Sequence, residues 1–332
     1  MLSFIGIGGA GCAAVDAMHR QDALSTLLSM LSHRETRGVA CDTSEALLSL
    51  RHIPPEFRVL IGRSRVKGHG TGGDVELGRR IMEEEIELLL RAVRRASAGG
   101  AFMLLAGLGG GTGTGGTPVV AERLRRLYSP KLFGAFVLPS RSEGMHYIRN
   151  VSRYGREVLE SVDGCILLEL GVLTGRGEEL AAAHRELTET LRGFLSTFSH
   201  THLMRELRGK TASVAYLRLR AERIPLRDVF FRMLRDRVFI DTEGLEVEKV
   251  CVLLTGEARA VYGESFARKW LMERLGAEVE VHMRDMPGSK YLSAGMIITG
   301  VEGVMEKYAL QKEERRKGMP EDIKSLLEDI RL

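Results

Sequence analysis

A glycine-rich segment is the part of this sequence whose residue types and spacing point most directly to chemistry. LLAGLGGGTGTGGTPVVAERL, residues 104–124, places seven glycines within ten residues, between an apolar run and a helical pattern that starts near Thr117 and Pro118. Glycine is costly to order, so such a run indicates backbone that another group approaches closely. Helix N-terminal amides bind anions, and Thr112 and Thr114 add hydroxyl donors. A flexible linker would lack the flanking apolar strand and the proline-started helix, so the pattern predicts a phosphate cradle.

Two common phosphate-binding motifs do not fit this segment. No Gly-Lys-Ser/Thr follows the glycines, and the dinucleotide-binding fingerprint fits only loosely, without an acidic residue at the distance that reads a ribose. The run instead closely resembles the signature loop of the tubulin and FtsZ superfamily, the polymerising GTPases of cytoskeletons and of bacterial and archaeal cell division. The chain resembles a divergent FtsZ-like protein of archaeal or bacterial type.

Four other segments resemble the remaining nucleotide loops of that superfamily, and all five occur in the family's order over about 170 residues. They resemble the first phosphate loop, the loop after the first helix, the loop over the terminal phosphate and the sugar-side loop: FIGIGGAGCAAVDAM (4–18), VACDTSEALL (39–48), VLIGRSRVKGHGTGGDVELGRR (59–80) and VLPSRSEGMHYIRN (137–150). The resemblance implies GTP or GDP as the ligand, and Mg²⁺ can accompany it.

The same loops supply the residues that the resemblance implies for nucleotide binding. Glu143 stands where the family holds a ribose hydroxyl, and His184 where a family aspartate reads the guanine edge. The complete expected set is Gly8, Gly9, Ala10, Gly11, Cys12, Thr71, Gly72, Gly73, Gly109, Gly110, Gly111, Thr112, Gly113, Thr114, Gly115, Glu143 and His184. We expect no catalytic residue and no metal ligand.

The positions that should read the base depart from the family pattern. Ala13 and Leu170 stand where the family has asparagines, and His184 replaces the aspartate. A carboxylate accepts hydrogen bonds from both guanine donors, whereas a neutral histidine accepts only one. Losing such a contact costs roughly 1–3 kcal/mol. The sequence therefore predicts weakened selectivity for guanine.

The segment expected to activate hydrolysis also departs from the pattern. The resemblance implies that acids in the loop after the central helix orient water and a cation against the terminal phosphate of the neighbouring subunit. Residues 196–210 contain no aspartate, and Glu206 is their only acid. His200 and His202 offer bases, but two histidines in a basic loop are more often structural or solvated.

These departures lead to one preferred interpretation and two alternatives. The preferred one is an FtsZ/tubulin-like, nucleotide-binding cytoskeletal protein that forms filaments and hydrolyses GTP weakly or not at all. The first alternative is an active self-assembling GTPase that uses Glu206, or His200 and His202. The second is a nucleotide-binding regulator that does not polymerise. The expected partners are other copies, stacked head to tail, or another FtsZ-like protein.

The elements that must position these loops follow from hydrophobic periodicity. Apolar runs alternate with helical patterns through the first half, which predicts an α/β fold with a parallel sheet covered on both faces. Each glycine loop follows an expected strand, at the edge where open α/β sheets bind ligands. The expected strands are 2–8, 37–41, 57–62, 101–108, 132–138 and 163–170.

The second half predicts a smaller α+β domain joined to the first by a long central helix. Its expected strands are 212–220, 248–256, 277–283 and 293–301, with a helix over 264–275. The predicted division is a nucleotide-binding domain (1–179), the central helix with its following loop (180–203), the second domain (204–303) and a charged C-terminal tail that could dock a partner (304–332).

Composition narrows the function classes further. A net charge of +4 over 332 residues gives no reason to expect a nucleic-acid partner. No apolar run is long enough for a membrane span, and the N-terminus has no export signal, which predicts a cytoplasmic protein. Cysteines occur singly, at no metal-ligand spacing, and are expected to be core residues: Cys12, Cys41, Cys165 and Cys251.

Overall fold

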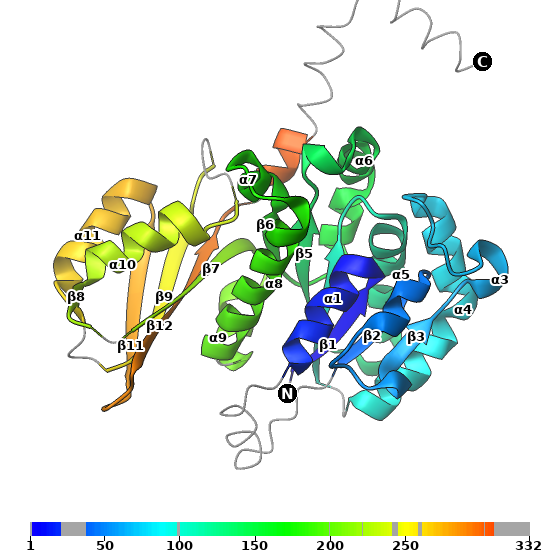
Figure 1. The fold of residues 1–332 in the computed structure, drawn as a ribbon, viewed down its shortest axis with the longest axis horizontal. Helices are drawn as coiled ribbons and strands as arrows, with labels where there is room; N and C mark the ends of the chain where they lie inside the picture. The colour runs from blue at the N-terminus through cyan, green and yellow to red at the C-terminus, as the bar shows by residue number, and fades with distance from the viewer. Residues whose placement is uncertain are drawn as a thin grey trace, which may run out of the picture.

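A mixed sheet runs through the molecule, and a small separate sheet pairs β8 (Ile224–Pro225) with β10 (Val261–Tyr262) (Figure 1). The computed structural model describes residues 2–20, 38–97, 100–198, 200–220, 222–240, 245–257, 261–301 and 303–308. Within these residues ten strands pair in the order β11-β9-β12-β7-β6-β5-β4-β1-β2-β3. Most of the predicted C-terminal tail, from residue 309 onward, lies outside the described residues.

The first half of the chain forms the parallel part of this sheet. Its strands are β1 (Leu2–Ile7), β2 (Gly38–Asp42), β3 (Arg58–Leu60), β4 (Ala101–Gly107), β5 (Lys131–Leu138) and β6 (Cys165–Glu169). Each pairs in parallel with its neighbours, which confirms the six predicted strands and the α/β fold class. The helices between them are α1 (Gly8–His19), α3 (Arg63–Val66), α4 (Val75–Ala96), α5 (Gly111–Tyr128), α6 (Met145–Glu160) and α7 (Leu170–Gly175).

Alternate residues of the central strands pack into two hydrophobic layers, one on each face of the sheet. Phe102 and Leu104 of β4 pack with α4 and α5, whereas Met103 and Leu105 pack with α1 and with α8 (Leu180–Thr197). The apolar residues of α4 that recur at helical spacing in the sequence form one buried stripe: Met82, Ile86, Leu89 and Val93. Because the sheet is covered on both faces, consecutive residues of a central strand must be apolar, as residues 102–105 of β4 are.

The second half continues the same sheet. Its main strands and helices are β7 (Thr211–Arg220), α10 (Leu226–Arg232), β9 (Lys249–Gly256), α11 (Glu264–Leu275), β11 (Glu278–Asp285) and β12 (Tyr291–Thr299). The predicted strands and helix are all present. β12 runs antiparallel to β7 and β9, and two residue pairs join β7 to β6. The domain boundaries drawn from the sequence stay predictions.

One segment differs from its sequence-based description as a loop. Residues 200–207 form helix α9 (His200–Leu207), which begins almost directly after α8 ends. Leu203 and Leu207, four residues apart, are buried, so one face of this segment gains apolar packing only when it is helical.

Across the described residues, none of the helices combines the length and the apolar character that crossing a membrane requires.

Candidate functional site

The carboxyl ends of four parallel strands border a cavity of about 250 Å³. Ile7, Gly107 and Val137 line it from the ends of β1, β4 and β5, and Leu170 lines it just after β6. Parallel strands end at the same edge of the sheet, so residues distant in sequence meet here. The cavity lies where the sequence predicts the glycine loops.

Two helices begin at this cavity. α1 starts at Gly8 and α5 at Gly111, and the first turns of both line the cavity. Neither helix has a side-chain cap or an acid in its first turn. Gly8 has φ +71°, which lets the chain turn from β1 directly into α1. Two uncapped N-termini that converge on one space favour an anion there.

The glycines of this cradle divide into two kinds. A Cβ added to Gly9 would meet only Asp42 Oδ2, at 3.9 Å, and one on Gly110 only Gly107 O, at 3.8 Å. A Cβ on Gly111 would instead lie 2.1 Å from Thr71 Oγ1. Close packing therefore explains why position 111 must be glycine. It does not explain the glycines at positions 9 and 110, where the absence of a side chain leaves room for a ligand.

The structure brings ten of the predicted residues to the cavity wall, and the other seven do not line it. The lining residues are Gly8, Gly9, Ala10, Thr71, Gly110, Gly111, Thr112, Gly113, Glu143 and His184. The remaining seven are Gly11, Cys12, Gly72, Gly73, Gly109, Thr114 and Gly115. Several of these shape the loops: Gly109 N donates to Thr114 Oγ1 at 2.8 Å, and a Cβ on Gly11 would lie 2.0 Å from Leu105 O.

A buried carboxyl stands beside the cradle, and the sequence reasoning did not single it out. Asp42, at the end of β2, accepts a hydrogen bond from Thr43 N at 2.7 Å, and burial raises the pKa of Asp42. The Thr43 and Thr112 hydroxyl oxygens are 2.7 Å apart. The sequence feature that could have identified Asp42 is an acidic residue at the end of an apolar strand. These groups place oxygen ligands next to the helix N-termini.

A larger cavity of about 1080 Å³ adjoins the first and shares Gly9, Ala10, Val137 and His184 with it. Ala13 lines the larger cavity, and Leu170 the smaller one.

Glu143 and His184, which the sequence assigns to sugar and base, meet at this junction. Glu143 Oε1 is 3.6 Å from His184 Nε2, and Glu143 Oε2 accepts from Ser140 N at 2.9 Å. Tyr147 and Pro139 also line the smaller cavity, although only their loop was predicted.

Two arginines on the wall of the larger cavity are paired with acids. Arg20 forms an ion pair with Glu189 at 2.9 Å, and Arg237 pairs with Glu186. Among the described residues, no lysine or arginine lines the smaller cavity. Backbone amides and helix dipoles are therefore the positive groups that this smaller cavity offers.

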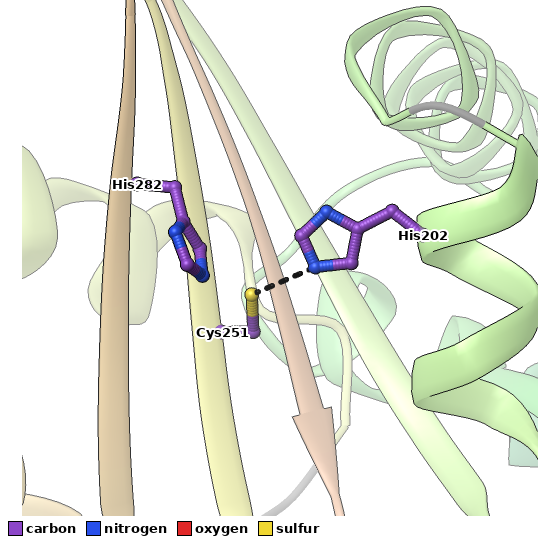
Figure 2. A group of neighbouring side chains, drawn as sticks. All are labelled: His202, Cys251 and His282. Carbon is purple, nitrogen blue, oxygen red and sulfur yellow. Dashed lines mark hydrogen bonds between the residues drawn. The ribbon is translucent and has the colours of Figure 1, made fainter.

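The residues considered for hydrolysis lie at the far end of α8. His184 lies 13 residues before Thr197, the last residue of α8, about 20 Å along the helix, and His200 begins the next helix, α9. His202 faces Cys251, with Nε2 3.7 Å from Sγ (Figure 2).

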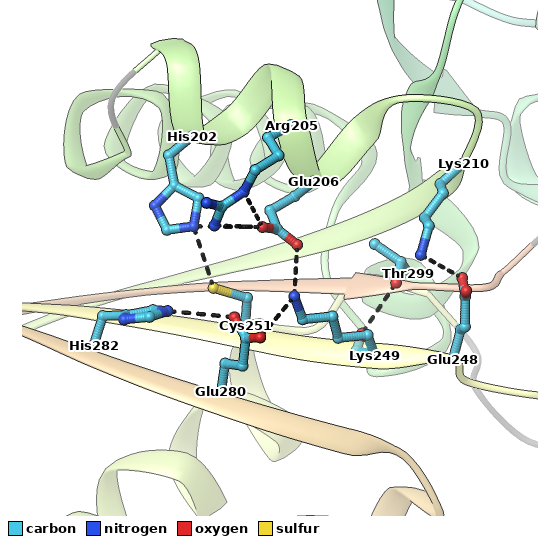
Figure 3. Close-up of polar contacts among 10 residues, drawn as sticks. All are labelled: His202, Arg205, Glu206, Lys210, Glu248, Lys249, Cys251, Glu280, His282 and Thr299. Carbon is cyan, nitrogen blue, oxygen red and sulfur yellow. Dashed lines mark hydrogen bonds and ion pairs between the residues drawn. The ribbon is translucent and has the colours of Figure 1, made fainter.

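Glu206 is buried and contacts Arg205 at 3.0 Å and Lys249 at 3.2 Å (Figure 3). Burial alone would raise the pKa of Glu206, but hydrogen bonds from these two cations hold it below its ordinary value. Its carboxylate is therefore already engaged within its own chain.

Comparison with known proteins gives consistent matches. The model of the Tubulin/FtsZ family, GTPase domain, matches residues 2–173. Tubulin-like protein CetZ1 of Haloferax volcanii is 36% identical over 193 residues, which cover 57% of this chain and 48% of that protein. The chain thus aligns with about half the length of this relative. Tubulin-like protein CetZ2 of the same organism is 27% identical over 338 residues, 91% of each chain.

Solved structures match the fold over nearly the whole chain. CetZ1 from Haloferax volcanii, a GDP-bound monomer, has a TM-score of 0.78 at 29% identity and covers 94% of this chain and 99% of that one. CetZ2 from the same organism, a GTPγS-bound protofilament, has a TM-score of 0.73 at 24% identity and covers the same shares. An empty FtsZ dimer from M. jannaschii has a TM-score of 0.65 at 18% identity and covers 91% and 88%.

Proposed function

The chain belongs to the tubulin/FtsZ family, and we propose from that premise that it is a cytoplasmic, filament-forming protein that binds GTP or GDP at the ends of β1 and β4. The observation that carries this proposal is the pair of uncapped helix N-termini on one cavity wall. Gly9 and Gly110 support it, because the space beside them is open within the protein. The solved CetZ1 relative is a GDP-bound monomer.

We assign the phosphates to the first turns of α1 and α5, the ribose to Glu143, and the base to the side of Ala13 and His184. The two adjoining cavities support this arrangement of phosphates and base, because the helix N-termini line the smaller cavity and Ala13 lines the larger one. Oxygen atoms of Asp42 and Thr112 would hold Mg²⁺, which prefers hard oxygen ligands. The ion would neutralise phosphate charge.

We further propose that copies of the chain stack head to tail. His184, which lines the nucleotide cavity, is near the start of α8, and α9 follows the end of this helix, about 20 Å farther along its axis. A contact between these two different surfaces repeats without closing, which is the geometry of a filament. The solved CetZ2 relative is a GTPγS-bound protofilament.

Within such a filament, GTP hydrolysis is slow. Thr201 is exposed and Met204 half-buried on α9, and neither carries the negative charge that orients water. Glu206 is engaged with Arg205 and Lys249 and would have to break both contacts to reach a neighbouring subunit. Losing positioning groups of this kind lowers rates by orders of magnitude.

Sedimentation and phosphate release, measured together across protein concentration with GTP, GDP and ATP, test the proposal. We expect GTP-dependent pelleting with turnover far below about 0.1 per second, the slow end of ordinary enzymes. Turnover that rises steeply with protein concentration to that rate would favour the active GTPase. Protein that binds GTP yet stays in the supernatant at every concentration would favour the non-polymerising regulator.

A further inference from the structure

Three potential metal ligands from α9, β9 and β11 converge on one face of the sheet (Figure 2). None of the three lines either of the two cavities described above. Parallel pairing aligns Cys251 of β9 with Glu280 of β11. Alternate residues of a strand share a face, so His282, two residues after Glu280, projects on the side of Cys251. α9 lies over this face and presents His202. The register of two strands and one helix therefore builds the cluster.

The spacing of the cluster matches a small metal site. His202, Cys251 and His282 each offer an atom, and these atoms all lie within 4.8 Å of one another. Zinc bonds of about 2.3 Å to sulfur and 2.0–2.1 Å to nitrogen, in a tetrahedral site, separate sulfur and nitrogen by roughly 3.6 Å. Cys251 Sγ and His202 Nε2 are 3.7 Å apart. Elsewhere in the described part of the chain, no three His, Cys, Asp or Glu side chains come as close.

We propose that His202, Cys251 and His282 bind one Zn²⁺ ion, with the Glu280 carboxylate in the fourth position. Glu280 Oε2 is 3.4 Å from His282 Nε2, close to the separation of neighbouring ligands in a tetrahedral site. Two imidazoles and a thiolate select zinc over magnesium or calcium, which prefer oxygen. This ligand set is independent of nucleotide binding.

Charged side chains of both signs surround the cluster, and Arg205 contacts Glu206 (Figure 3). Glu206 and Glu280 flank the cluster, and Lys249 bridges them at 3.2 and 3.0 Å. Glu206 Oε1 is also 3.6 Å from His202 Nε2, the same nitrogen that faces Cys251 Sγ, so this carboxylate places a negative charge beside the proposed ion. Binding would require Lys249 to move away from Glu280 and the Glu280 carboxylate to move toward the other three ligands.

Metal binding would also change the thiol. Cys251 is 1% exposed, and burial raises its pKa to about 12, so without metal the sulfur keeps its proton. When the sulfur–zinc bond forms, that proton passes to solvent. The ion would then tie α9 to β9 and β11, fixing the segment that we propose faces the next subunit.

Absorption spectroscopy with Co²⁺ as a probe, on the full chain stripped with a chelator, tests the site directly. We expect a thiolate-to-cobalt charge-transfer band that saturates at one ion per chain and disappears when Zn²⁺ is added. Cys251→Ser should remove the band, and His282→Gln should weaken Zn²⁺ binding at least tenfold. His282 is exposed, so its replacement leaves the core untouched.

Matched control variants show whether metal binding depends on these residues or on other cysteines and histidines of the chain. Cys165→Ser changes another buried strand cysteine, and His52→Gln another exposed histidine; both should bind as the wild type does. Zn²⁺ should raise the thermal unfolding temperature of the wild type and of these controls, but not that of His282→Gln.

Three results would overturn the proposal: no thiolate band in the wild type, a band that persists in Cys251→Ser, or unchanged Zn²⁺ affinity in His282→Gln. Full affinity in Glu280→Gln would overturn the assignment of the fourth ligand.

Discussion

Replacing Gly110 with valine should strongly weaken nucleotide binding and leave the fold intact. Gly110 precedes α5 with φ −71° and ψ 153°, extended values that valine favours, and its Cβ would meet only Gly107 O at 3.8 Å. The methyl groups would instead occupy the space assigned to phosphate. Losing two hydrogen bonds to a charged phosphate, at about 1.5–3 kcal/mol each, removes about 3–6 kcal/mol. That corresponds to a Kd about 10² to 10⁴ times higher.

The neighbouring glycine provides a contrast within the same loop. A Cβ on Gly111 would lie 2.1 Å from Thr71 Oγ1 and 2.4 Å from Asp74 O, so Gly111→Ala should lower the unfolding temperature. Gly110→Val should keep or slightly raise that temperature, because replacing glycine reduces the entropy of the unfolded chain.

Calorimetric titration with GDP, alongside thermal unfolding, measures both effects. Gly175→Val is the control, since a Cβ there meets nothing within 4 Å and Gly175 lines neither cavity. Wild-type GDP affinity in Gly110→Val would refute the cradle assignment.

Three other changes probe the base, the acid on α9 and the response to pH. His184→Asp should raise the ratio of guanine to adenine nucleotide affinity by a few-fold to about a hundredfold, as a returning acceptor contributes roughly 1–3 kcal/mol; competition titrations measure this ratio, and an unchanged value would count against the assignment. Glu206→Gln should lower the free energy of unfolding by about 1–3 kcal/mol, because Arg205 and Lys249 lose a charged acceptor, and should leave GTP turnover unchanged; a stable variant without turnover would instead make Glu206 catalytic. His19, the last residue of α1, is half-buried, and its pKa is lowered, mainly by burial, so the unfolded chain binds the proton more tightly. Stability should therefore fall as the pH drops below about 6.5, and His19→Gln should flatten this dependence in denaturant titrations at pH 5.5 and 7.5; an equal slope in both proteins would refute it.

The sequence alone determined the order of elements and the chemistry of the glycine loops. Strand and helix periods are local properties, so the main strands, the stripe from Met82 to Val93 and the helix over 264–275 could all be predicted. Glycine density after a strand is also local, which is why the cradle of α1 and α5 could be placed. Residues 200–207 were misjudged as a loop because their helix depends on burying Leu203 and Leu207 against the sheet.

Only the tertiary structure decided what each loop residue does. Gly110 and Gly111 are equivalent in sequence, yet one faces open space and the other packs against Thr71, because α4 lies beside only the second. Strand register and helix placement are non-local, so no spacing in the chain reveals which distant side chains meet. His202, Cys251 and His282 are separated by 49 and 31 residues, and they come together because β9 pairs with β11 beneath α9.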